Sequence, residues 1–103
     1  MRIIKEKTLR LYTSQSRYSP ARESLEALIY LARYSYWNSP ADLKARLRNV
    51  SNISSKRVVF NIKGNEFRLV VDIIYRYGII YVIWFGSHVE YDKIDVRKIR
   101  YGD

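Results

Sequence analysis

The chain has no cysteine, only one histidine, and no apolar run long enough to cross a membrane as a helix. Without cysteine it can form neither disulfides nor thiolate sites, and with one histidine a zinc site is not expected. The first residues also lack the charged-then-apolar pattern of a signal peptide. The sequence therefore predicts a cytoplasmic protein with no membrane segment, no metal and no other cofactor.

Acidic residues are also scarce. Lys and Arg number 19 against 10 Asp and Glu, which gives a net charge of +9. The excess is uneven, with ten basic and four acidic residues in positions 1–50 and nine against six in 51–103. Such a surplus favours a polyanionic partner, either nucleic acid or an acidic protein, because each neutralised phosphate releases counterions. The alternative is a soluble protein that is basic without such a partner. Ten tyrosines fit the first reading, since exposed aromatic rings can stack on unpaired bases.

With 103 residues, 48% of them hydrophobic, the chain can build one domain, residues 1–103, around one core. Three segments of the second half have the composition or alternation of β-strands: Arg57–Ile62, Phe67–Arg76 and Ile79–Gly86. Gly64-Asn65 separates the first two, and Tyr77-Gly78 separates the last two. The chain is therefore expected to form three consecutive antiparallel strands.

Two-residue turns at both positions fix a register. They place Asn61 opposite Arg68 and Arg68 opposite Ser87, in one polar row beside the Lys63 turn and the exit to His88. A bulge or a longer loop would shift this row. The other face collects apolar side chains and is predicted to be the core: Val58, Phe60, Ile62, Phe67, Leu69, Val71, Ile73, Val82 and Trp84.

The first half reads as a short edge strand, Arg2–Ile4, followed by helices. The first helix is expected over about Glu6 to Ser16, with Leu9 and Tyr12 on its inner stripe. Ser19-Pro20 supplies an N-cap and a proline at the first helical position, so a second helix is expected from there to about Tyr36. Its inner face carries four apolar residues: Leu25, Leu28, Ile29 and Ala32.

Ser39-Pro40 is a second serine N-cap followed by a proline, and it predicts a third helix to about Leu47, with Asp42 in its first turn. A polar connector, Asn49 to Lys56, leads into the strands. The predicted fold class is α+β, with two to three N-terminal helices packed on one face of an antiparallel sheet in the order β-α-α-β-β-β.

Four segments carry a resemblance to a known family: KTLRLY, WNSPADLKARL, RVVFNIKGNEFRLVV and GSHVEYDKID, in this order. Together they resemble the HigB family of type II toxin–antitoxin toxins, mRNA interferases of the RelE-like superfamily, over nearly the entire chain. The resemblance implies a small RelE-like domain that cleaves mRNA without a metal, usually in the ribosomal A site. It also implies a cognate, HigA-like antitoxin as partner, besides mRNA and the ribosome.

Cleavage of RNA without a metal requires a base for the 2′-hydroxyl, an acid for the leaving 5′-oxygen, and cations for the phosphorane. His88 is the natural acid or base, because imidazole titrates near neutral pH. The alternative is a histidine that only caps a strand end, and the resemblance favours the functional reading, since the family has functional residues in the segment matching SHVEYD. Arg68 suits phosphate binding through its planar guanidinium, although it could instead pair with Glu66.

Lys63 and Tyr91 complete the predicted catalytic set. Lys63 could hold a backbone phosphate, or could simply be a solvated turn residue. Tyr91 could orient the substrate, stack on a base or assist proton transfer, or it could be a core or interface residue. Which of His88, Tyr91 and Lys63 is the base stays open.

A second group is predicted to contact RNA: Asn61, Arg57, Arg76, Ser87 and Lys93. Arg57 opposite Asp72 could equally form a cross-strand pair. Asp92 could cap a short C-terminal helix through Lys98. Trp84 and Trp37 are assigned to packing rather than to base stacking. Four arginines of the helical half could contact ribosomal RNA or an acidic antitoxin, or form a solvated face: Arg10, Arg17, Arg22 and Arg33.

The residues and the resemblance together predict a toxin that acts as a metal-independent mRNA endoribonuclease. The resemblance to the superfamily implies that the 2′-oxygen attacks in line and that the products are a cyclic phosphate and a 5′-hydroxyl. Two alternatives remain. ParE-like toxins share the architecture but act on DNA gyrase without nuclease activity, so fold alone does not decide the chemistry. A plain nucleic-acid-binding module would use the same basic residues without cleavage.

Overall fold

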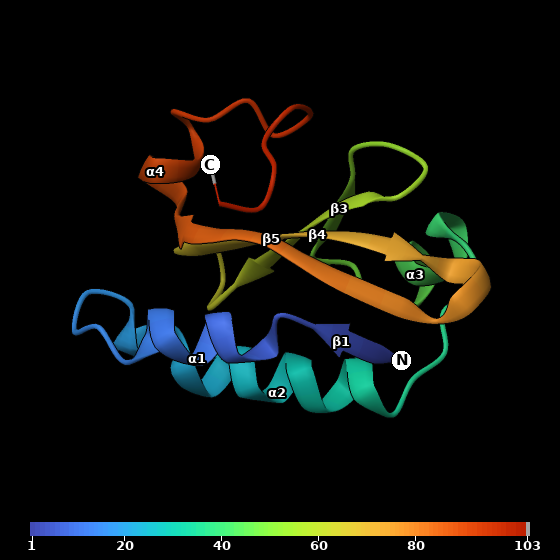
Figure 1. Cartoon of the computed structure of the whole chain (residues 1–103), viewed down its shortest axis with the longest axis horizontal. Helices are drawn as coiled ribbons and strands as arrows, with labels where there is room; N and C mark the ends of the chain where they lie inside the picture. Colours follow the sequence, from blue (N-terminus) through green and yellow to red (C-terminus); the bar gives the residue numbers. More distant parts are fainter. Residues whose placement is uncertain (103) are drawn as a thin grey trace.

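A five-stranded mixed sheet forms the middle layer of the molecule (Figure 1), and the computed structural model describes residues 1–102. The elements in chain order are β1 (Arg2–Ile4), α1 (Glu6–Thr13), η1 (Ser19–Ala21), α2 (Arg22–Arg33), α3 (Pro40–Arg46), β2 (Val50–Asn52), β3 (Arg57–Ile62), β4 (Phe67–Ile74), η2 (Tyr75–Tyr77), β5 (Ile79–Ser87) and α4 (His88–Tyr91). Helices α1 and α2 lie on one face of the sheet, and α4 with the chain that follows it lies on the other (Figure 1). This arrangement confirms the predicted α+β class.

The sheet order is β1-β5-β4-β3-β2, with β2 to β5 antiparallel and β1 parallel to β5. The edge position predicted for Arg2–Ile4 is confirmed, but this strand makes the sheet mixed rather than purely antiparallel. The polar connector also contains a strand that was not predicted, Val50–Asn52, which pairs with β3. Three residues are too few to show the alternation that identifies a strand in a sequence.

The helices follow the predicted pattern with shorter bounds. The first ends at Thr13, not Ser16, and the second ends at Arg33, not Tyr36. Ser19 does not cap α2, because Ser19–Ala21 forms a separate 3₁₀ turn and the Ser19 hydroxyl donates to the carbonyl of Ser16 at 3.0 Å.

The third helix begins as predicted. The Ser39 hydroxyl accepts a hydrogen bond from the Asp42 amide at 3.0 Å, and Pro40 is the first helical residue. This helix ends at Arg46, one residue before the predicted end. None of the helices within residues 1–102 combines the length and apolar content needed to cross a membrane.

The main core fills the space between α1, α2 and the sheet. It contains the predicted inner faces of the helices, with Leu9, Leu25 and Ile29 all at most 4% exposed. Trp37 is 2% exposed and packs near Phe60, which confirms its assignment to packing. The strands contribute a row of buried apolar side chains: Val58, Phe60, Ile62, Phe67, Leu69, Val71, Ile73, Ile80, Val82 and Phe85.

The register between β3 and β4 is as predicted, with Asn61 opposite Arg68. The register between β4 and β5 differs, because η2 lengthens the second turn and a bulge interrupts the ladder between Val70 and Val71. Arg68 therefore lies opposite Gly86 instead of Ser87. The bulge also turns Trp84 to the face away from the helices, so its assignment to the main core was wrong.

A second, smaller cluster covers that other face. Val59 and Val70 project from the sheet and pack with Trp84 and with side chains of residues 92–102, which we call the C-terminal strap. Ile99, 8% exposed, is the buried anchor of the strap. The helix predicted from Asp92 to Lys98 is not formed, since α4 spans only His88–Tyr91 and Asp92 follows its last residue.

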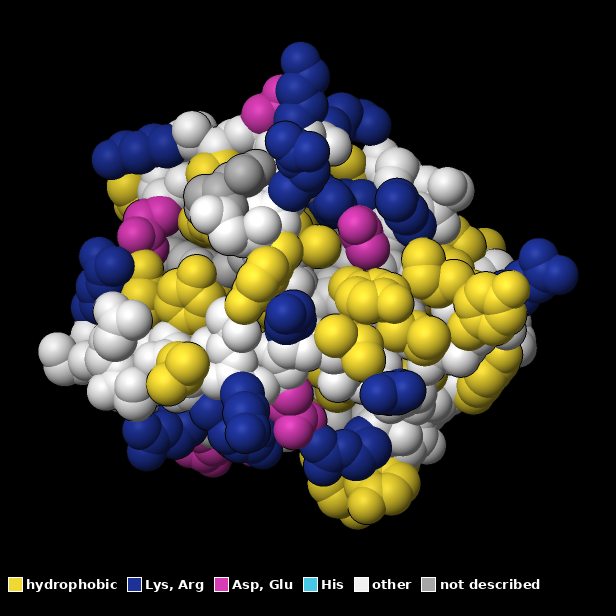
Figure 2. All heavy atoms as spheres, viewed as in Figure 1, with side chains coloured by type: hydrophobic (Ala, Val, Ile, Leu, Met, Phe, Trp, Pro, Cys, Tyr) yellow, Lys and Arg dark blue, Asp and Glu magenta, His cyan; other side chains and the backbone are white. Residues whose placement is uncertain are grey.

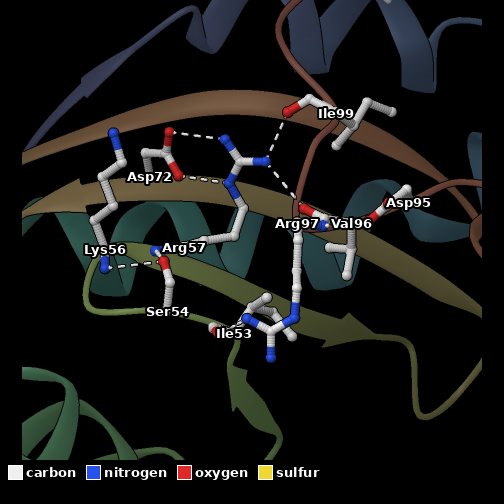
Figure 3. A network of polar contacts seen from close by, with 9 residues as sticks. All are labelled: Ile53, Ser54, Lys56, Arg57, Asp72, Asp95, Val96, Arg97 and Ile99. Atoms are coloured by element: carbon white, nitrogen blue, oxygen red, sulfur yellow. Dashed lines mark hydrogen bonds and ion pairs between the residues drawn. The ribbon is translucent and has the colours of Figure 1, made fainter.

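Arg57 ties the strap to the sheet (Figure 3). Its guanidinium binds the Asp72 carboxylate at 2.6 and 3.0 Å and donates to the carbonyls of Val96 and Ile99 at 3.0 and 2.6 Å. Because Arg57 is only 8% exposed and is engaged on both sides, its role is structural. The predicted cross-strand pair with Asp72 is therefore formed, and the prediction that Arg57 contacts RNA does not fit this structure.

Candidate functional site

The β3–β4 hairpin loop, residues 63–66, brings the main predicted site residues together at one end of the sheet. The His88 amide donates to the carbonyl of Glu66 at 2.9 Å, which fixes the start of α4 against this loop. The Arg68 guanidinium donates to the carbonyl of Asn65 at 2.8 Å. Lys63 is part of the same loop and adopts a left-handed φ of 53°. The tertiary structure thus brings the predicted residues Lys63, Arg68 and His88 together at the hairpin loop.

Arg68 is available for an anionic ligand. No carboxylate of residues 1–102 lies within ion-pair distance of its guanidinium, and the predicted alternative partner, Glu66, instead contacts Lys63 at 3.7 Å. The guanidinium carbon lies 5.8 Å from the centre of the Tyr91 ring, close enough for a cation–π contact. Arginine keeps its charge in any protein environment, so this position is a permanent cation.

Tyr91 lies between the second cluster and Arg68. Its ring centre is 6.2 Å from that of Trp84, and burial raises the pKa of the phenol, while Arg68 opposes part of this shift. A phenol with a raised pKa stays protonated at neutral pH. Tyr91 can therefore donate a hydrogen bond or a proton, and it is poorly suited to act as a base.

His88 is the first residue of α4 and its side chain is exposed. Within the described part of the chain the imidazole makes no hydrogen bond or ion pair, so no protein group engages its ring nitrogens. The predicted alternative was a histidine that only caps or hydrogen-bonds at a strand end, and it is not seen within residues 1–102, because the imidazole makes no hydrogen bond there and Ser87 is the N-cap of α4. Ser87 was predicted to contact RNA, but its hydroxyl accepts from the Glu90 amide at 3.1 Å.

Glu90 holds α4 in place and was not predicted as a site residue. Its carboxylate accepts from the Ser87 amide and from the Tyr18 hydroxyl, each at 2.9 Å, and lies 3.7 Å from the guanidinium of Arg17. Burial acts to raise the pKa of Glu90, but these hydrogen bonds and the Arg17 charge outweigh it and lower the pKa. The carboxylate thus joins α4 to the segment between α1 and η1.

Part of this arrangement is readable in the sequence. Ser87-His-Val-Glu90 is a capping box, in which the serine and the glutamate bind each other's backbone amides. The contacts from Tyr18 and Arg17 have no such signal, because they join positions 72 and 73 residues apart, as counted from the sequence numbers.

Other predicted RNA contacts lie at the margin of the site or away from it. Asn61 pairs with Arg68 and lines an open cleft of about 330 Å³ together with Lys63 and Asn49. Lys93 is exposed just after α4. Arg76 belongs to η2, at the opposite end of β5 from His88, and does not join the cluster.

The basic residues of the helical half are mostly engaged with partners. Arg10 pairs with Glu6 and Glu26, Arg33 also pairs with Glu6, and Arg22 donates to a carbonyl. Lys and Arg side chains are nevertheless spread widely around the rim of the face seen in Figure 2. Within residues 1–102 no three His, Asp or Glu side chains gather where they could hold a metal ion.

The sequence matches a known toxin family over most of its length. A family model described as the RelE-like toxic component of a toxin–antitoxin system, the HigB toxin family, matches residues 21–94. The chain belongs to the HigB toxin family. The mRNA interferase toxin HigB of Escherichia coli K12 is 30% identical over 94 residues, which cover 89% of this chain and 88% of the relative. The mRNA interferases HigB of Escherichia coli O157:H7 and Shigella flexneri match to the same extent.

The residues matched by the family model include the predicted catalytic residues of the candidate site. The matched region begins at Ala21, immediately before α2, and ends at Ile94, after α4. It includes the hairpin loop, Arg68 and Tyr91. The chain is therefore the toxin component of a toxin–antitoxin pair, and an antitoxin protein is its expected partner.

Proposed function

We propose that this HigB-family toxin is an endoribonuclease that cleaves mRNA and thereby inhibits translation and growth. The observation that carries the proposal is Arg68, a cation without a carboxylate partner in the described residues, beside the protonated phenol of Tyr91 and the loop that holds His88. The mRNA interferase names of its relatives support the same activity.

The cluster can supply the groups that RNA cleavage requires. In this scheme the 2′-hydroxyl loses its proton to a base and its oxygen attacks the neighbouring phosphorus in line. The bond from phosphorus to the 5′-oxygen breaks, and that oxygen takes up a proton. The products are a 2′,3′-cyclic phosphate and a 5′-hydroxyl, so atoms and charges balance without an added reagent.

Each residue has a role that fits its surroundings. Arg68 stabilises the phosphorane charge through its planar, always charged guanidinium. His88 transfers a proton, because its imidazole is exposed and unengaged. Tyr91 donates rather than accepts a proton, since burial raises its pKa. Lys63, 45% exposed in its side chain, contacts a backbone phosphate at the loop.

The test is to induce the wild type and single variants in bacteria and to map new mRNA 5′ ends. Wild type should create new 5′-hydroxyl ends, and His88→Ala and Arg68→Ala should each remove them while leaving the far-ultraviolet circular dichroism unchanged. Arg46→Ala is the matched control, because it deletes a 62% exposed arginine on α3 that belongs to no part of the proposed site. Its cleavage should equal that of wild type.

Ribosome dependence belongs to the same proposal. Ends phased to the reading frame, and cleavage in a translating extract but not of naked mRNA, would support action on the ribosome. Growth arrest without new RNA ends would refute the nuclease assignment and favour a gyrase inhibitor or a simple binding protein. Full toxicity of both site variants would refute the site assignment.

A further inference from the structure

Trp84 lies at the candidate site although its sequence context predicts a core residue. The bulge in the β4–β5 ladder pairs Val70 with Trp84 but Val71 with Val82, so one extra residue, Ile83, is inserted in β5. This insertion leaves Val82 in the main core and turns Trp84 to the face that carries Arg68 and Tyr91. There the indole is half-buried rather than enclosed.

The indole reaches along β5 and covers Gly86. A Cβ atom built on Gly86 would lie 2.5 Å from Cη2 and 2.7 Å from Cζ2 of Trp84, so the six-membered ring occupies the space where a side chain would project. Gly86 is the cross-strand partner of Arg68. The ring therefore lies in the row that the sequence predicted to be polar, directly beside the strand that presents Arg68.

Two aromatic rings and one guanidinium, which are side-chain types that can bind RNA, meet at this point. The Trp84 and Tyr91 ring centres are 6.2 Å apart, and the Arg68 guanidinium lies over the Tyr91 ring. Trp84 also lines an open cleft of about 360 Å³ with residues of the C-terminal strap, including Lys98. That volume falls at the lower end of the range of about 300–1,000 Å³ typical of small-molecule sites. Lys98 is exposed and forms no ion pair in the described chain, whereas Asp95, also in the lining, places one negative charge at the cleft.

We propose that Trp84 is the stacking platform for one nucleobase of the RNA substrate, next to the phosphate held by Arg68, with Lys98 contacting the backbone of that nucleotide. The inference rests on the proposed endoribonuclease function and adds the residue that orients the substrate. Stacking suits this position, because a single-stranded RNA bound without base pairing presents its base faces to aromatic rings. Each such contact strengthens binding by a factor of roughly 5 to 150.

The chain offers a direct optical test. It contains two tryptophans, and the other one, Trp37, is 2% exposed in the main core. Titration with a short 2′-O-methyl RNA, which lacks the attacking hydroxyl, should quench wild-type tryptophan emission in a saturable manner. Trp84→Phe should abolish the quenching, because only the buried Trp37 remains to report. Anisotropy of a fluorescently labelled copy of the same RNA measures binding independently.

Replacement by a non-aromatic side chain tests the energetic role. Trp84→Leu is expected to weaken RNA binding at least ten-fold and to reduce the frequency of new 5′ ends in cells by a similar factor. Trp84→Phe should retain cleavage within about three-fold, since it keeps an aromatic face. Tyr77→Leu is the matched control, because it removes a 68% exposed aromatic ring at the other end of β5. Urea unfolding of each variant verifies that the fold is kept.

The outcomes separate this proposal from the nuclease assignment. RNA that binds by anisotropy without changing the emission of Trp84 would overturn the stacking role while leaving the endoribonuclease proposal intact. Where free RNA binds too weakly to titrate, the cleavage frequencies decide, and a folded Trp84→Leu variant that cuts like wild type would overturn it. Loss of cleavage in Trp84→Leu together with retained cleavage in Trp84→Phe would support the stacking role. No cleavage by wild type would refute the proposed function itself.

Discussion

Replacing Arg57 with methionine is expected to lower the free energy of unfolding by about 3–5 kcal/mol, the cost typical of removing one partner of a buried ion pair. The Arg57 guanidinium connects the sheet to the strap, because it donates hydrogen bonds to the carbonyls of Val96 and Ile99 (Figure 3). Methionine keeps most of the buried side-chain volume, so a cavity contributes little. The loss comes from the Asp72 carboxylate and the two carbonyls that are left without a donor.

The magnitude can be checked against the parts. A hydrogen bond to a charged group contributes roughly 1.5–3 kcal/mol, and an unsatisfied buried acceptor costs about 1–3 kcal/mol. Asp72 keeps some contact with water, because its side chain is 13% exposed, which holds the total below the sum of these values. Arg57→Met should therefore remove a large share of the roughly 5–15 kcal/mol that stabilises a typical small domain.

Equilibrium unfolding in urea measures this change. With a slope of roughly 1–3 kcal/mol per molar, the midpoint should fall by about 2 M. Arg46→Met is the matched control, because Arg46 also pairs with an aspartate, Asp42, but its side chain is 62% exposed. Exposed pairs contribute at most about 1 kcal/mol, so its midpoint should barely move. Equal midpoints for the two variants would refute the view that Arg57 anchors the strap.

Three further outcomes follow from the packing and the charges. Gly86→Ala should cost about 1–3 kcal/mol in urea unfolding, because the added methyl group collides with the Trp84 ring; an unchanged midpoint would mean that the ring moves freely. Ser39→Ala should lower the free energy of unfolding by about 1 kcal/mol, because the Asp42 amide loses the hydroxyl that caps it. An unchanged midpoint of thermal unfolding would contradict this. Glu90 has a lowered pKa when folded, so its contribution is complete above the ordinary glutamate pKa of 4.5 and is lost as pH falls through the folded pKa. Unfolding free energies measured from pH 7 down to pH 3 should therefore decline less in Glu90→Gln than in wild type, and identical pH profiles would exclude this role.

Local sequence patterns were enough to predict most of the helices and strands and part of the candidate site. Alternation identified β3, and a Ser-Pro pair located the start of α3, because strand periodicity and helix capping depend on residues a few positions apart. The Gly64-Asn65 turn set the pairing of Asn61 with Arg68 for the same reason, since a short hairpin leaves one register. The three-residue strand β2 and the length of the second turn gave no comparable signal.

The sequence by itself determined the α+β class, the first hairpin and the residue types that suit RNA chemistry. Only the tertiary structure decided which of them meet. A single inserted residue in β5 moved Trp84 from the core to the face of Arg68, because side chains in a strand alternate between faces. Arg57 became structural once the strap folded over it, and Glu90 met Tyr18 across 72 positions of sequence. Such contacts depend on the summed geometry of the whole sheet and its covering segments, which no local pattern encodes.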